Sequence, residues 1–117
     1  MAAPNIVNVS TITGKTAVLV ITTTPTAIVT NSAASNKVFK INALYVSNID
    51  GTNSADLNVD LFRSSTAYRI AYTVAVPADT SLDVLSKSVY LEEGDSLRLT
   101  ASANSRLEGI CSYEEIS

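Results

Sequence analysis

Apolar and polar residues alternate along most of this chain, which is the pattern of β-strands with one buried face. In the stretch 56–62 (DLNVDLF), two leucines and a valine fall on one face, and acids and asparagine fall on the other. The stretch 96–102 (SLRLTAS) repeats the pattern with Leu97 and Leu99 inward. In 67–76 (AYRIAYTVAV), alternation predicts five inward side chains: Tyr68, Ile70, Tyr72, Val74 and Val76. No window has the periodicity of a helix.

Two other stretches are apolar on both faces. In 38–48 (VFKINALYVSN), alternation puts Leu44 and Val46 on one face, and on the other Phe39, Ile41, Ala43 and Tyr45. The stretch 16–22 (TAVLVIT) is more uniform still. Such a run is typical of a central strand or of a strand that faces a neighbouring subunit. We therefore expect part of 16–30 to lie in a subunit interface.

Turn-forming residues separate the predicted strands. Gly14 with Lys15 is expected to divide the first two strands, and Pro25 indicates a bend or an edge position. The polar segments NSAASNK and DGTNSAD are predicted loops, and PADTS follows a strand that ends at Val76. The spacing predicts an all-β fold in a single domain over 1–117: a two-sheet antiparallel β-sandwich of about eight strands, jelly-roll-like in topology.

Composition narrows the range of partners. Of the 117 residues, 46% are hydrophobic and only 16% are charged, which favours a homo-oligomer because apolar surface tends to be covered. The net charge of −3 leaves no excess of cations, so we expect no nucleic acid and no membrane as partners. The start, MAAPNIVNVS, does not resemble a signal peptide, and synthesis in the cytoplasm is expected. The single cysteine, Cys111, is expected to be a small buried hydrophobe.

The candidate chemistry is sparse. The chain has no histidine, which removes the commonest general base and the Ser-His and Cys-His nucleophile pairs. Neither a glycine-rich phosphate loop nor zinc-spaced cysteines occur, and the acids that a carboxylate pair would need lie on short polar loops. We therefore expect no catalytic residues, no cofactor and no enzymatic activity.

Two acidic clusters are candidate cation sites. Asp50, Asn53 and Asp56 offer oxygens of the kind calcium takes, although the same residues suit an ordinary solvated turn, which we favour. The second cluster, 92–95 (EEGD), is interpreted as the solvent-exposed tip of a hairpin, at which Gly94 supplies a positive φ.

The tyrosines are expected to serve packing. Tyr68 and Tyr72 share their predicted face with Ile70, which favours the core over a platform for stacking sugars. Tyr45 and Tyr90 have similar neighbours.

Several stretches together resemble a known family: NIVNVSTITGKT, AIVTN, KVFKINALYVSNIDGTNSADLNVDLF, VPADTSLDVL, YLEEGDSLRLTASA and the ending SYEEIS. They are similar to short virion structural proteins of marine tailed phages, notably contractile-tailed phages of cyanobacteria. The resemblance runs from Asn5 to Ser117. It carries no catalytic or ligand-binding residues.

The resemblance implies a non-enzymatic virion protein, made in the host cytoplasm, whose partners are other phage structural proteins of the capsid or tail. Capsid decoration, or cement, is the preferred role because the chain has no coiled-coil segment. The alternatives are an accessory subunit of the neck, tail or fibres, and a carbohydrate-binding or receptor-binding β-sandwich.

Overall fold

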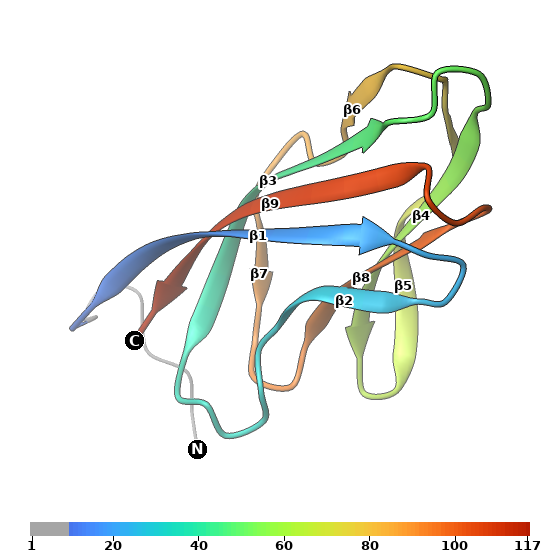
Figure 1. The fold of residues 1–117 in the computed structure, drawn as a ribbon. Coiled ribbons are helices and arrows are strands. Elements are labelled where there is room, and N and C mark those ends of the chain that lie inside the picture. Colours follow the sequence, from blue (N-terminus) through green and yellow to red (C-terminus); the bar gives the residue numbers. More distant parts are fainter. Residues whose placement is uncertain (1–9) are drawn as a thin grey trace.

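The computed structural model describes residues 10–117, and the signal-peptide prediction concerns residues that lie mostly outside that range. The described chain has no helix and forms nine strands (Figure 1): β1 (Ile12–Ile21), β2 (Thr26–Thr30), β3 (Val38–Asn48), β4 (Ala55–Arg63), β5 (Thr66–Val76), β6 (Ser81–Asp83), β7 (Val89–Leu91), β8 (Ser96–Ala101) and β9 (Leu107–Ile116).

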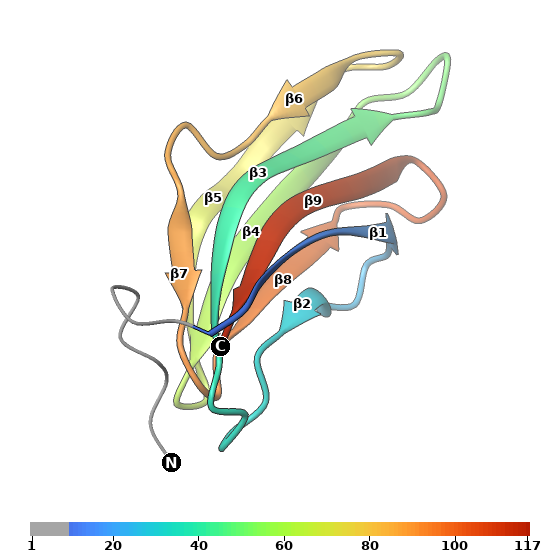
Figure 2. The same cartoon turned by 90° about the vertical axis from the view of Figure 1, so that its left-hand side faces the viewer.

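The strands form two antiparallel sheets packed face to face (Figure 2). Sheet A has the order β1-β9-β3-β6, with β7 also paired to β3, and sheet B has the order β2-β8-β4-β5. Since β7 and β6 pair with successive parts of β3, together they occupy one strand position. Counted in this way, each sheet has four positions, and the order is that of a jelly roll. The predicted fold class is confirmed.

The core lies between the sheets and follows the predicted alternation in β4 and β8. Leu57, Val59, Leu97 and Leu99 are fully buried, as their spacing predicts. Sheet A contributes further fully buried side chains: Ile21, Ile41, Leu44, Val46, Leu91 and Leu107. Burial of each such side chain contributes about 1.5–3 kcal/mol, so the core supplies the main drive for folding.

The predicted turn at Gly14 and Lys15 is wrong. β1 runs through both residues and pairs with β9 in one uninterrupted register from Ile12 to Ile21. Gly14 does not have a positive φ, and Lys15 is held by an ion pair with Glu115 on β9, with 2.8 Å between Nζ and Oε2. Cross-strand contacts therefore keep the strand extended where local sequence favoured a break.

The predicted faces of β3 change midway along the strand. The register with β9 shifts between Ile41 and Ala43, so Asn42 forms a bulge. Phe39 and Ile41 point inward before it, whereas Leu44 and Val46 do so after it. The bulge turns Tyr45 outward, and the prediction that Tyr45 packs in the core is wrong.

The same correction applies to the tyrosines of β5. The register with β4 shifts twice, and Thr73 has a φ of 53°. Because β5 is also the edge of sheet B, Tyr68 and Tyr72 are 56% and 64% exposed. Tyr90 on β7 is likewise exposed.

Candidate functional site

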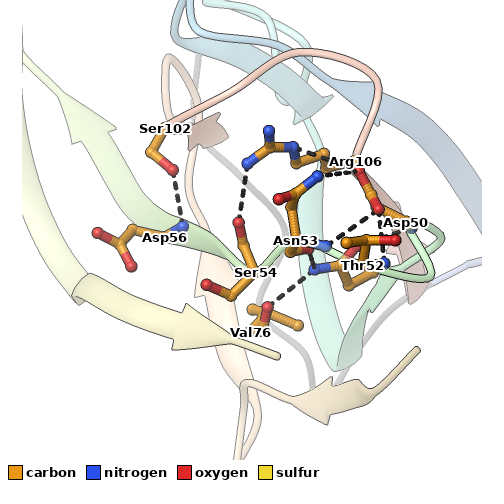
Figure 3. Close-up of polar contacts among 9 residues, drawn as sticks. Asp50, Thr52, Asn53, Ser54, Asp56, Val76, Ser102 and Arg106 are labelled. Atoms are coloured by element: carbon orange, nitrogen blue, oxygen red, sulfur yellow. Dashed lines mark hydrogen bonds and ion pairs between the residues drawn. The ribbon is translucent and has the colours of Figure 1, made fainter. Parts of the chain in front are cut away.

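The loop 50–54, between β3 and β4, is organised around the carboxylate of Asp50 (Figure 3). Its Oδ1 accepts hydrogen bonds from the backbone N–H of Thr52 at 2.8 Å and of Asn53 at 3.1 Å. Its Oδ2 accepts from the Asn53 amide at 3.3 Å and lies 3.5 Å from Nε of Arg106. The two backbone hydrogen bonds are the main reason that the pKa of Asp50 lies below its usual value.

The three candidate cation ligands do not converge. Asp50 and Asn53 lie together, but Figure 3 shows Asp56 on the other side of the loop, with Arg106 and Ser54 between. The Asp56 N–H donates to Ser102 Oγ at 2.8 Å, which ties this residue to the loop after β8. Within residues 10–117, no three acidic or cysteine side chains group as metal ligands would. Asp50 and Asn53 form a hydrogen-bonded turn, whereas Asp56 lies on β4 and outside the predicted loop.

Two buried asparagines hold the ends of the sandwich, and sequence reasoning missed both. The Asn48 amide donates to the carbonyls of Asn53 and Val76, each at 2.9 Å, and its Oδ1 accepts from the N–H of Asp50. At the opposite end, the amide of Asn31 donates to the carbonyls of Lys37 and Leu91.

The only sequence signal was an asparagine at the junction of an apolar strand and a polar loop, where one side chain can replace several backbone partners.

The acidic stretch 92–95 is not the tip of a hairpin. β7 belongs to sheet A and β8 to sheet B, so this turn crosses between the sheets. Gly94 has the predicted positive φ, at 88°. Asp95, however, is only 2% exposed and is paired with Arg63 at the end of β4. The prediction that the acids of this stretch are solvent-exposed is therefore wrong for Asp95.

The Asp95 carboxylate is fully engaged. It accepts hydrogen bonds from Nε and Nη2 of Arg63 and, at 2.8 Å, from the N–H of Glu92. Burial opposes its ionisation, but these donors outweigh burial and lower the pKa of Asp95. The same carboxylate raises the pKa of the Arg63 guanidinium. The arrangement is a structural clamp that fixes the turn between β7 and β8 to the end of β4.

A second buried acid lies on the outer face of sheet B. Asp60 is 1% exposed and accepts a hydrogen bond from Arg69 at 2.8 Å. The Arg69 guanidinium also covers the ring of Tyr72, and that of Arg98 lies 3.8 Å from the ring centre of Phe62. These contacts cover the outer face with stacked side chains.

Exposed apolar side chains gather on the outer face of sheet A. Val18 and Val20 are 74% and 58% exposed, and Ile110 beside Val18 on β9 is 44% exposed. Tyr45 lies opposite Ile110 on β3 and extends the row. We call these four residues the β1 surface. A shallow groove runs between β1 and β9, and its lining includes Val18, Val20 and Ile110 but not Tyr45.

The β1 surface decides between the two interpretations of the apolar stretch 16–22. β1 is an edge strand of sheet A, so the central-strand alternative is wrong. Ala17, Leu19 and Ile21 face the core, while Val18 and Val20 face outward. A neighbouring subunit remains the prediction.

Cys111 is fully buried, as expected, and burial raises the pKa of its thiol to about 11. No helix in the described part of the chain could cross a membrane.

Neither family models nor curated protein sequences match the chain. Solved structures do. One is a structure of Bacillus endospore appendages, described as a novel family of disulfide-linked pili, with a TM-score of 0.52 and 14% identity over 92% of this chain and 88% of that chain. Another is the nucleoplasmin-like N-terminal domain of Drosophila FKBP39, with a TM-score of 0.44 and 14% identity over 87% and 85%. At this identity, the likeness to the pilus structure shows a shared fold and nothing more.

Proposed function

We propose that this chain is a non-enzymatic structural subunit of a phage virion and, within the particle, a capsid decoration or cement protein. The observation that carries the proposal is the β1 surface, where apolar side chains gather on one face of a folded domain. Exposed apolar rows of this kind mark interaction sites. The resemblance to virion structural proteins supplies the identity of the partners, which are other phage structural proteins.

The polar groups support the same role. Each buried acid is engaged by an arginine: Asp95 by Arg63, and Asp60 by Arg69. A general acid or base needs a free position within hydrogen-bond reach of a substrate, whereas both oxygens of Asp95 accept hydrogen bonds from the protein itself. Buried acid–arginine pairs of this kind suit a structural subunit.

Detection in purified particles tests the proposal. Mass spectrometry of density-purified virions should find this chain at a copy number comparable with that of other capsid proteins. A chain that is abundant in the infected cell but missing from the particles would refute the proposal. Labelled particle images would then separate capsid decoration from a neck, tail or fibre position.

One observation favours a second candidate, a carbohydrate-binding or receptor-binding module. Tyr68 and Tyr72 are exposed on the edge strand β5, and aromatic rings are common stacking surfaces for sugars. Arg69 covers Tyr72, which leaves Tyr68 as the open ring. A glycan array that compares the wild type with Tyr68→Ala tests this candidate. Absence of binding by the wild type would remove the candidate, and binding retained by Tyr68→Ala would exclude Tyr68 as the stacking ring.

A further inference from the structure

We propose that two copies of this chain pair antiparallel through their β1 strands, which joins their A sheets across a two-fold axis. The inference rests on the proposed role as an assembling subunit and names the surface used. The partner is a second copy of the chain. The surface is the edge of β1 that pairs with no other strand among residues 10–117, together with the adjoining β1 surface.

β1 is the one long and regular edge that the described strands offer. It spans ten residues, and its register with β9 has no shift. The other edges are interrupted or short: β2 has five residues and a bulge, β6 and β7 have three residues each, and β5 carries two register shifts with a positive φ at Thr73.

β1 also lacks the features that prevent an edge strand from pairing with another chain. Proteins protect exposed edges with charges, proline, bulges or short length, because unpaired backbone groups recruit another strand. The only charged residue of β1 is Lys15, and its ammonium is drawn toward Glu115 on the neighbouring strand. The half from Ala17 to Ile21 carries no charge. The β1 edges of two copies can therefore pair with each other without bringing like charges together.

The distribution of side chains places the axis. Pairing near Lys15 would bring two ammonium groups together, whereas pairing within Ala17–Ile21 brings apolar side chains together. An axis beside Leu19 sets Val18 opposite the second copy's Val20. The outward valines of both copies then form one apolar strip, with Ile110 flanking it on each side.

Because two β1 edges pair, the contact is isologous and closes as a dimer. A pairing of β1 with a different edge would be heterologous and would continue into a chain of subunits. No other described edge is regular enough to receive ten residues of β1. The two-fold dimer is therefore the assembly that these strands favour.

The test begins with the association state of the isolated protein. Light scattering after size exclusion, over a wide concentration range, should show a dimer for the wild type. Val18→Lys should weaken the dimer by about tenfold or more in Kd, because a two-fold contact contains the substitution twice. Val18 is exposed, so circular dichroism should show an unchanged fold. Tyr68→Lys, on the edge strand of the other sheet, is the matched control and should remain dimeric.

Cross-linking tests the register. An equal mixture of Val18→Cys and Val20→Cys proteins should form more disulfide dimer than either protein alone, since the axis sets these positions opposite each other. Cys111 is buried and gives little background.

Four results would each overturn the proposal. In the association test they are a monomeric wild type, a dimer that Val18→Lys does not weaken, and a dimer that Tyr68→Lys dissociates. In the cross-linking test it is a mixture that forms no more disulfide dimer than either protein alone. A monomer that is nevertheless found in virions would overturn only the pairing. A β1 dimer absent from virions would overturn only the virion role.

Discussion

Replacement of Arg63 by methionine removes the clamp that fixes the turn between β7 and β8 to the end of β4. Two hydrogen bonds from the guanidinium to the buried Asp95 carboxylate are lost, whereas the bond from the Glu92 N–H remains. Hydrogen bonds to charged groups contribute about 1.5–3 kcal/mol each. Since the Arg63 side chain is 41% exposed, solvent screens part of this, and we expect a loss of about 2–4 kcal/mol in the free energy of unfolding.

The loss should depend on pH. In the wild type, the pKa of Asp95 lies below its unfolded value near ~3.9, so its stabilisation is present above that pH and disappears as the pH falls through the folded value. Without Arg63, no cation offsets the effect of burial on the Asp95 carboxylate, so the pKa of Asp95 should be higher in the variant than in the wild type. The variant's deficit should therefore be greatest near neutral pH and should shrink as the solution approaches pH ~4.

Urea unfolding followed by circular dichroism, near neutral pH and near pH ~4, measures both effects. Adding Asp95→Asn to the Arg63→Met protein should restore part of the stability, because the unpaired charge is gone. Lys15→Met, which breaks an ion pair at the surface, serves as the control and should leave the midpoint unchanged within error. Equal deficits at both pH values, or none at either, would refute the clamp.

Three further results are expected. Asn48→Ala should lower the free energy of unfolding by about 2–3 kcal/mol in urea melts, because two buried carbonyls lose their donor, and a neutral result would contradict this. Leu99→Ala should cost about 3–4 kcal/mol in the same assay by opening a cavity in the core, and a loss below about 1 kcal/mol would count against the packing. Cys111 should resist a thiol reagent in the folded protein and react when it is unfolded in urea, whereas rapid native labelling would contradict its burial.

The strand pattern of this chain was predictable wherever a strand is regular. β4 and β8 alternate with period two along their cores, and their buried leucines were assigned correctly. β3 and β5 were assigned as strands, but the faces of their side chains were assigned only in part, because a bulge residue exchanges inside and outside beyond it. Tyr45 and Tyr72 are exposed against the prediction, whereas Val76 is buried as predicted. A bulge is set by pairing with a distant strand, and alternation within one strand does not encode it.

The polar features show a similar division. The predicted turn at Asp50 depends on hydrogen bonds within a few residues, and it is present. The clamp of Arg63 on Asp95 joins residues 32 positions apart, and local sequence gave the acid no partner. The exposure of Val18 depends on the position of β1 at the edge of a sheet, which follows from the order of all strands.

The central claim is that this chain is a structural part of a virion. Quantitative mass spectrometry of purified particles, with the infected-cell lysate as reference, tests it most directly. The account predicts that the chain is enriched in the particles along with the capsid proteins. Depletion from the particles, with the protein abundant in the lysate, would contradict it.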